Sequence, residues 1–185
     1  MTQIAQRMTS DEYLAEPEDS RRTELVEREI VVHGPNSLHQ LVVLDLLRAL
    51  DGWATAQPGR GQVFLPLDVK LDDRNVFSPD LLWYAKDRAP ERDGSWPYAL
   101  PNLAVEVRSR STWRYDIGAK KSAYERHGLA ELWLVDTAAH EVLAFRRSTR
   151  DCAAFDVSLE LGVDDELASP LLPGFVLALR PLFEP

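Results

Sequence analysis

An acidic residue inside an apolar strand pattern constrains this sequence most strongly. Residues 103–107 read Leu-Ala-Val-Glu-Val, which predicts a strand. Side chains alternate along a strand, so the large apolar residues share one face, whereas Glu106 and Arg108 share the other. A buried carboxylate costs free energy unless a cation or hydrogen bonds meet it. We therefore weigh two interpretations of Glu106 equally: a structural ion pair with a base such as Arg108, and a functional carboxylate.

A second acid stands at the start of another apolar run. Asp80 follows Pro79 and precedes residues 81–84, which read Leu-Leu-Trp-Tyr. Taken alone, Asp80 is typical of a turn or a helix cap. Taken with Glu106, it gives two acids on two apolar strands joined by a polar loop, and these can face one another across a sheet. Two carboxylates, with water or phosphate in the remaining positions, suit Mg²⁺, so the pair predicts a Mg²⁺ or Mn²⁺ site.

A basic residue is expected to reach the same place from a helix predicted over residues 116–127. Ile117 and Tyr124 are seven residues apart and mark the inward side of this helix. Lys120 lies between them, whereas Lys121 is turned away by about a third of a circle. The prediction is that Lys120 points inward and Lys121 outward.

Asp116, Lys120 and Tyr124 have the spacing i, i+4, i+8 and therefore line one helix face. One interpretation is a surface pair between Asp116 and Lys120, worth only a few tenths of a kcal/mol. The other is an ammonium group held near the acids, where it orients or activates a water and offsets phosphate charge.

The order of elements indicates the fold class. The predicted elements are a capped helix from residue 8, a hairpin of 23–26 and 29–32, a helix over 37–52, strands over 62–65, 67–71 and 76–84, a loop over 86–99, the strand and helix described above, strands over 131–136 and 141–145, and a short Pro-rich tail. This order predicts a mixed β-sheet flanked by helices, which is an α/β class at the border of α+β. A length of 185 residues predicts one domain, residues 1–185.

Several function classes are disfavoured. No apolar run is long enough for a membrane span, and residues 1–7 lack the apolar stretch of a signal peptide. Cys152 is a single cysteine, which allows no internal disulfide, and no Cys/His spacing indicates zinc. We expect a cytoplasmic protein without a membrane partner.

The net charge of −9 is unusual for a nucleic-acid-binding protein, because phosphate neutralisation supplies most non-specific affinity. Only local basic clusters exist: Arg21-Arg22, Arg108 with Arg110 and Arg114, Lys120-Lys121, and Arg146-Arg147. We interpret the first and last clusters as ordinary solvated surface. The clusters of Arg108 with Arg110 and Arg114, and of Lys120 with Lys121, lie beside the candidate acids and are therefore harder to interpret as ordinary surface.

An ordered set of short motifs runs along nearly the whole chain: Glu24-Leu25-Val26, His39 early in a helix, Pro79-Asp80, Glu106-Val107-x-Ser109 with Ser111-Thr112, Asp116-x-x-x-Lys120-x-x-x-Tyr124, Gly128, Trp133-Leu134-Val135-Asp136, and Ser169-Pro170-Leu171-Leu172-Pro173-Gly174-Phe175. Each motif is weak alone, but the ordered set resembles the Uma family. Members of that family are predicted nucleases of the restriction-endonuclease-like superfamily, whose core motif is an acid followed by Glu-x-Lys.

The resemblance implies roles for individual residues. It implies Asp80 and Glu106 as metal ligands and Lys120 as the motif lysine, displaced from the strand onto the helix. It also implies that Glu24 completes the metal environment. His39 matches a family histidine, but a lone histidine on an apolar helix is more often a core or capping residue, and we keep that interpretation.

Arg108 and Arg110 depart from the family pattern, which usually has Leu and Pro at these positions. Arg108 also occupies the place of the lysine in an unmodified Glu-x-Lys motif. It could bind a scissile phosphate through two hydrogen bonds, or it could form a salt bridge that neutralises Glu106. The sequence is compatible with both.

Two functional hypotheses follow. The first is a Mg²⁺-dependent endonuclease that hydrolyses phosphodiester bonds of nucleic acid, with double-stranded DNA as the expected substrate and Asp80, Glu106 and Lys120 as catalytic residues. The second is a catalytically inactive nuclease fold that acts as a binding or regulatory protein. The acidic balance and Arg108 favour the second hypothesis, and the intact acid–acid–lysine set favours the first.

A homodimer is also expected, because pairing two copies would place two basic rims, around Arg108, Arg110, Arg114 and Lys120, beside one duplex. The apolar surface for this contact is predicted at residues 133–136 and 141–145, with Leu171, Leu172 and Phe175 nearby. The alternative is that the chain's own tail covers this surface.

Overall fold

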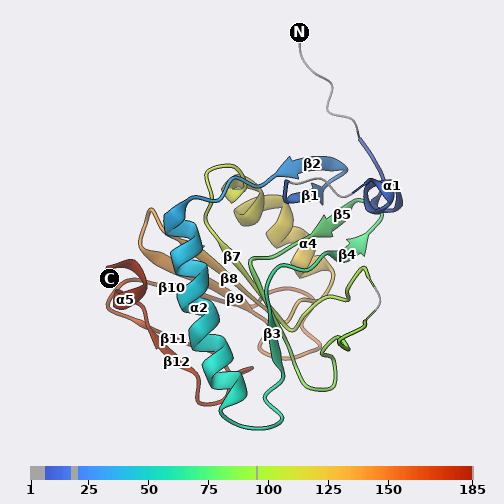
Figure 1. Cartoon of the computed structure of the whole chain (residues 1–185). Helices are drawn as coiled ribbons and strands as arrows, with labels where there is room; N and C mark the ends of the chain where they lie inside the picture. Colours follow the sequence, from blue (N-terminus) through green and yellow to red (C-terminus); the bar gives the residue numbers. More distant parts are fainter. Residues whose placement is uncertain (1–6, 18–20, 95, 185) are drawn as a thin grey trace.

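The centre of the structure is a six-stranded sheet with the strand order β10-β9-β8-β7-β6-β3. Figure 1 shows the computed structural model, which describes residues 7–17, 21–94 and 96–184. The strands of this sheet are β3 (Gln62–Phe64), β6 (Leu81–Tyr84), β7 (Leu103–Val107), β8 (Glu131–Asp136), β9 (Glu141–Arg146) and β10 (Val157–Leu161). Strands β7 and β8 are parallel and the other neighbours are antiparallel, so the predicted mixed sheet is confirmed.

A second sheet, with the order β2-β1-β5-β4, lies beside the first. Its strands are β1 (Thr23–Val26), β2 (Glu29–Val32), β4 (Val69–Asp72) and β5 (Asn75–Phe77). The predicted hairpin is confirmed: β1 and β2 pair through a tight turn in which Glu27 and Arg28 have φ angles of 51° and 71°. The predicted capping box is also confirmed, because Thr9 caps α1 (Ser10–Ala15) together with Glu12.

Helices cover both faces of the central sheet. Helix α2 (Ser37–Thr55) crosses one face in Figure 1, and its buried side packs on the large apolar residues of β7. The connection between the parallel strands β7 and β8 contains α3 (Trp113–Tyr115), the π-helical turn η1 (Asp116–Lys120) and α4 (Lys121–Arg126). Residues of α4 pack with Ala104 of β7 in a second core. Strand β7 therefore alternates between two cores as predicted, and Glu106 shares the α4 side with Ala104.

The C-terminal part contains more structure than the predicted Pro-rich tail. It holds β10, a two-stranded sheet of β11 (Glu166–Ala168) and β12 (Val176–Ala178), and α5 (Arg180–Phe183). Phe175 stacks on Trp133 with ring centroids 5.8 Å apart, and Leu172 is fully buried. The apolar surface predicted for dimer contact is therefore covered by the chain's own tail, which was the alternative prediction.

Two differences from the predicted element boundaries affect the core and the site. Helix α2 continues past Gly52 to Thr55, because Trp53 and Ala54 are buried against the core and extend its apolar side. The single strand predicted over residues 76–84 is two strands in different sheets, β5 and β6, separated by Ser78-Pro79-Asp80. Proline has no backbone N–H for a sheet hydrogen bond, so the chain changes sheet at this point.

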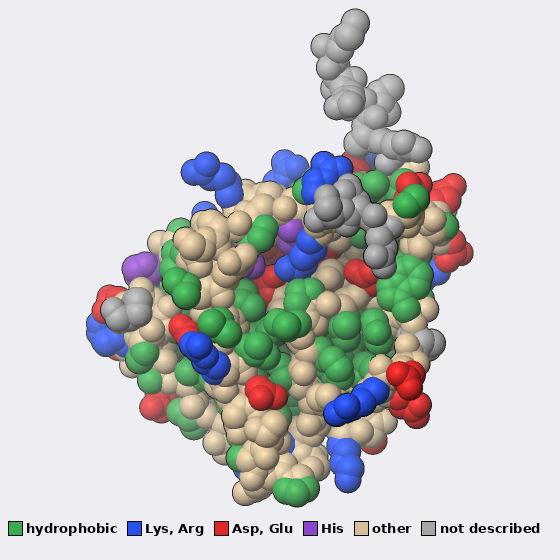
Figure 2. Space-filling model, viewed as in Figure 1, with side chains coloured by type: hydrophobic (Ala, Val, Ile, Leu, Met, Phe, Trp, Pro, Cys, Tyr) green, Lys and Arg blue, Asp and Glu red, His purple; other side chains and the backbone are tan. Residues whose placement is uncertain are grey.

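Not every leucine of the helical pattern in α2 is part of the core. Leu38, Leu41 and Leu44 are exposed, and Leu41 is 59% exposed. Figure 2 shows hydrophobic side chains gathered on the face of the molecule that α2 crosses in Figure 1. In the described residues, no helix is both long and apolar enough to cross a membrane. Most of the segment examined for a signal peptide, residues 1–6, lies outside the described residues.

Candidate active site

A fully buried lysine forms the centre of the candidate site. Lys120 Nζ lies 2.7 Å from Glu106 Oε1, 2.9 Å from Glu24 Oε1 and 3.0 Å from Asp116 Oδ1. The three carboxylates come from β7, β1 and the π-helical turn, so Lys120 joins three separate elements. The structure thus brings Lys120 together with Glu106 and Asp116, as the sequence predicted, and with Glu24, which the resemblance implied.

The π-helical turn determines which residues of this segment face inward. Lys121 turns away as predicted, with its Nζ 4.4 Å from the centre of the Phe145 ring. Ile117, predicted to mark the inward side, is instead 47% exposed, and that prediction is wrong. A π-helical turn closes with i→i+5 rather than i→i+4 hydrogen bonds, so the side chains within it, Ile117 included, are rotated relative to later residues of the helix. The seven-residue spacing to Tyr124 therefore does not keep Ile117 on the buried face.

Glu106 has two partners on the α4 side of the sheet. Tyr124 donates a hydrogen bond of 2.8 Å to Glu106 Oε1, the same oxygen that contacts Lys120. Tyr124 itself is held edge-on against Phe77, with ring centroids 5.2 Å apart. Asp116 is held in turn by the Thr112 hydroxyl, which donates to Asp116 Oδ2 over 2.9 Å. The predicted face of Asp116, Lys120 and Tyr124 is therefore buried against Glu106.

Glu24 lies at the inner end of the β1–β2 hairpin. Its carboxylate contacts Lys120, accepts a hydrogen bond of 2.6 Å from the Ser78 backbone N–H, and lies 2.8 Å from His33 Nε2. Burial alone would raise the pKa of Glu24, but Lys120 and His33 stabilise its charged form and lower the pKa to about 2. Glu24 is therefore ionised at neutral pH.

Asp80 lies in the segment where the chain passes from β5 to β6. Its Oδ2 accepts a hydrogen bond of 2.8 Å from the Val107 backbone N–H, next to Glu106. Its Oδ1 lies 2.8 Å from Arg22 Nη1 and 3.3 Å from His39 Nε2. Burial would raise the pKa of Asp80, but the His39 hydrogen bond and the Arg22 charge lower it well below its usual value.

The pKa values of Glu106 and Lys120 are both shifted by their neighbours in the site. Burial raises the pKa of Glu106 well above its usual value, and although Lys120 opposes this shift, the nearby Asp116 and Glu24 add to it. Burial alone would lower the pKa of Lys120, but the surrounding carboxylates raise it well above its usual value. Lys120 is therefore protonated, and the charged form of Glu106 is disfavoured despite its contact with Lys120.

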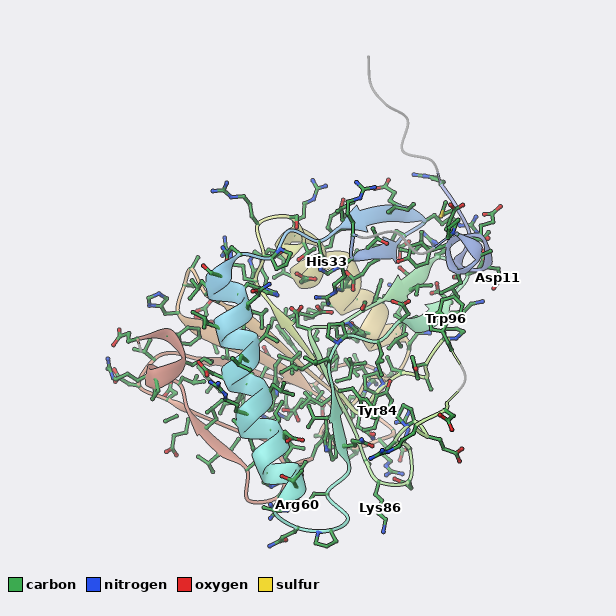
Figure 3. All side chains as sticks on the ribbon, viewed as in Figure 1. Asp11, His33, Arg60, Tyr84, Lys86 and Trp96 are labelled. Atoms are coloured by element: carbon green, nitrogen blue, oxygen red, sulfur yellow. The ribbon has the colours of Figure 1, made fainter. Side chains whose placement is uncertain are left out.

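The sequence interpretation missed two residues of the site, Arg22 and His33. The Arg21-Arg22 cluster was interpreted as solvated surface, which is wrong for Arg22 because it pairs with Asp80. Arg22 and His33 lie opposite one another just beyond the β1–β2 hairpin, where the His33 N–H donates to the Arg22 carbonyl. Extending the predicted hairpin by one pair would have placed both residues beside Glu24. Figure 3 labels His33 close to the start of α2.

The structure also bears on the two open questions on His39 and Arg108. His39 is buried, as the core interpretation expects, and its Nε2 lies 3.3 Å from Asp80 Oδ1. Arg108 does not pair with Glu106. Strand β7 ends at Val107, and the Arg108 guanidinium lies 2.8 and 2.7 Å from the two carboxylate oxygens of Asp136. The alternative in which Arg108 neutralises Glu106 is therefore wrong.

The donor set can be tested against a divalent cation. In residues 7–17, 21–94 and 96–184, no three His, Cys, Asp or Glu side chains are arranged to hold a metal ion. Mg²⁺ does not require such a cage, because it keeps several waters and binds one or two carboxylates. Asp80 and Glu106 offer carboxylate oxygens of this kind, and the site's carboxylates outnumber its permanent cations, Lys120 and Arg22. These residues fit a divalent cation in donor type and in charge.

Comparison with protein families decides the relationship. A family model described as Uma2, "Putative restriction endonuclease", matches residues 10–180. The chain belongs to the Uma2 family. The resemblance drawn from the ordered motifs is thereby confirmed, and membership of Uma2 supports nuclease activity.

A solved structure shows the same fold. The crystal structure described as "a putative nuclease belonging to DUF820 from Anabaena variabilis ATCC 29413" superposes on this Uma2 chain with a TM-score of 0.79. The two sequences are 20% identical, and the alignment covers 95% of this chain and 97% of the other. The predicted nuclease-type fold, a mixed sheet flanked by helices, is therefore confirmed. No curated protein matches this Uma2 sequence.

Proposed function

We propose that this chain is a Mg²⁺-dependent endonuclease, with Mn²⁺ as an alternative ion, that hydrolyses phosphodiester bonds in double-stranded DNA. The observation that carries the proposal is the contact of Lys120 with Glu106 in a cluster of buried carboxylates beside Asp80. Burying so many like charges is costly for stability alone, and such groups are enriched at functional sites.

Asp80 and Glu106 are the proposed ligands, since Glu106 lies on β7, Asp80 directly precedes the neighbouring strand β6, and Asp80 is bonded to the residue that follows Glu106. When bound, a divalent cation would polarise a water molecule and offset charge on the phosphate. Glu24 contributes a third carboxylate from the hairpin. Its bonds to Ser78 and Lys120 hold it in place rather than leaving it free.

Lys120 and Tyr124 are proposed to position Glu106. Both contact Glu106 Oε1, so they hold one carboxylate oxygen and restrict the orientation of the other. Lys120 also keeps a permanent positive charge beside the proposed ligands, where it would offset negative charge that a phosphate gains during hydrolysis without touching the phosphate. We propose Lys120 as the catalytic cation and Tyr124 as a positioning residue.

One argument for the alternative, a catalytically inactive domain, no longer applies. Arg108 favoured that alternative because a salt bridge to Glu106 would have blocked the ligand, but Arg108 pairs with Asp136 instead. Arg108 remains partly exposed and stacks over Trp113, so a contact with a phosphate stays part of the proposal.

We further propose that the chain acts as a two-fold dimer on DNA in the cytoplasm. The net charge of −9 leaves little basic surface on one copy, and pairing would bring two rims to one duplex. The rim must be Arg108, Arg110 and Arg114 alone, because Lys120 is fully buried. The proposed dimer contact must also use a surface other than the one around Trp133, which the chain's own tail covers.

The experiment that tests the function is incubation of the purified chain with supercoiled plasmid DNA, and separately with single-stranded RNA. We expect nicked and linear plasmid in Mg²⁺ or Mn²⁺ and none with a chelator. Cleavage of RNA alone would change the proposed substrate. No cleavage of either, together with no rise in melting temperature on adding Mn²⁺, would leave the inactive alternative.

A further inference from the structure

Arg22 holds one of the two carboxylate oxygens of Asp80, the proposed cation ligand. Arg22 Nη1 lies 2.8 Å from Asp80 Oδ1, and Arg22 Nη2 donates to the Ser78 carbonyl. The other oxygen of Asp80, Oδ2, already accepts the Val107 N–H. Two positive charges within about 4 Å of each other repel, so a divalent ion and this guanidinium cannot both bind Asp80 Oδ1 at full strength. Cation binding at Asp80 therefore competes with Arg22.

Arg22 differs from Lys120 because its side chain is partly exposed to solvent. Lys120 is fully buried among three carboxylates, and leaving them would unpair all three. The Arg22 side chain is 27% exposed and lines a groove of about 920 Å³ that also contacts Thr23, Ile30 and Trp96. Figure 2 shows basic, acidic and histidine side chains meeting in a hollow on this face. Of the site's two permanent cations, Arg22 is the one with access to a ligand from outside.

One donor of Arg22 is not used in this arrangement. Arg22 Nε is buried, and no acceptor among the described residues meets it. A buried donor without a partner costs free energy, and this cost would be relieved by an acceptor that reaches the whole guanidinium. Phosphate oxygens match the planar fork of an arginine and can accept two hydrogen bonds at once.

We infer that Arg22 exchanges partners: it pairs with Asp80 as long as no divalent cation is bound there, and it transfers to a nucleic-acid phosphate when a divalent cation binds Asp80. This inference rests on the proposed function. It implies that cation and phosphate bind cooperatively. A cation alone must displace Arg22 without giving it a new partner, whereas a cation with phosphate gives Arg22 one.

Mn²⁺ binding to the purified full chain, measured by calorimetry, tests this exchange without any activity assay. In the absence of nucleic acid, R22Q should bind Mn²⁺ at least about fivefold more tightly than the parent, the low end of coupling between linked sites. R28Q is the matched control, because Arg28 pairs with exposed Asp73 and its loss removes the same charge. R28Q should bind Mn²⁺ as the parent does.

A second measurement adds a DNA duplex protected from cleavage by phosphorothioate linkages. The duplex should tighten Mn²⁺ binding to the parent more strongly than to R22Q, because only the parent can transfer Arg22 to a phosphate. If R22Q does not fold, R22K replaces it. R22K keeps the charge at Asp80 but lacks the fork, so its Mn²⁺ binding should respond less to the duplex than that of the parent.

The outcomes separate the two proposals. A parent chain that binds Mn²⁺ and cleaves DNA, with R22Q binding Mn²⁺ no more tightly, overturns the Arg22 exchange and leaves the nuclease function intact. R22K responding to the duplex as strongly as the parent overturns the exchange as well. A parent chain that binds no Mn²⁺ and cleaves nothing overturns the nuclease function, and the Arg22 exchange falls with it.

Discussion

Lys120 is the residue whose environment departs most from that of an ordinary side chain. A lysine is almost never fully buried without partners, and here three carboxylates surround the ammonium group. Removing the charge leaves those acids buried beside one another. The stability of the fold around the site therefore depends on the same residue that we propose for catalysis.

Lys120→Met should be strongly destabilising, by about 3–5 kcal/mol, because losing one partner of a buried ion pair leaves uncompensated charge. The free energy of unfolding from urea titration measures this. Lys121→Met is the matched control: Lys121 is partly exposed and packs on Phe145, so its loss should cost about 1 kcal/mol or less. Equal losses for the two variants would contradict the central position assigned to Lys120.

For single residues, the sequence predicted side-chain orientation correctly for Glu106 in its regular strand and for Lys120 and Lys121 in their helical segment. Alternation along a strand placed Glu106 opposite the large apolar residues, and helical spacing placed Lys120 inward and Lys121 outward. The partners that arrive from other elements were not predictable in this way. Arg22 and His33 lie just outside the predicted hairpin strands, and their contacts with Asp80 and Glu24 depend on how two sheets meet.

The β1–β2 hairpin is the element that brings Glu24, Arg22 and His33 to the site. Its turn residues Glu27 and Arg28 both have positive φ, a conformation that favours Asn or Gly over side chains of this kind. The hairpin therefore carries a local cost that the tertiary contacts of β1 with β5 must offset.

Arg28→Gly should be more stable than Arg28→Ala by about 1 kcal/mol, since both lose the ion pair with Asp73 but only glycine relieves the left-handed backbone. Thermal unfolding of the two variants under identical conditions gives the difference. An alanine variant as stable as the glycine variant would show that the turn is not strained at this residue.

The π-helical turn illustrates what local pattern cannot give. A single sequence with α-helical spacing predicted one regular helix over residues 116–127, yet the helical segment begins at Trp113 and contains η1. In this turn Asp116 and Lys120 are buried and paired with each other, while Ile117 faces outward. Such turns are set by the tertiary contacts they permit, and they frequently occur at functional sites.

On the scale of the whole molecule, the sequence predicted the order of elements up to β9 and the sidedness of the central sheet. It did not predict β10 to β12, whose strands are short and whose place depends on covering apolar residues of β8 and β9. The sequence interpretation also joined β5 and β6 into one predicted strand. The run over residues 76–84 is apolar throughout, apart from Ser78, Pro79 and Asp80, and only the proline signalled a change of sheet.

Assembly is a separate prediction at this scale. Sedimentation at micromolar concentration should give a species of twice the chain mass, because the proposed cleavage of both strands needs two sites on one duplex. A purely monomeric species would contradict the paired-site proposal. Such a monomer should then nick supercoiled plasmid without producing linear DNA in a single binding event.

The central claim is that Glu106 belongs to a metal-dependent nuclease site, whereas other buried acids of the same sheet serve structure. Glu131 provides the matched comparison: it is buried at the start of β8, where it accepts hydrogen bonds from Trp133 and Ser169. Glutamine keeps the size of glutamate and removes its charge, so both variants should fold. Glu106→Gln also relieves repulsion among the site's carboxylates, so its melting temperature without metal should not fall.

The most direct measurement is the rate of plasmid cleavage in Mg²⁺ by the parent, Glu106→Gln and Glu131→Gln at equal concentrations of folded protein. We expect Glu106→Gln to lose more than about a hundredfold in rate, since even outer-shell partners of metal ligands cost up to that much. Glu131→Gln should cleave within a few-fold of the parent. Cleavage by Glu106→Gln at the parental rate would contradict the account.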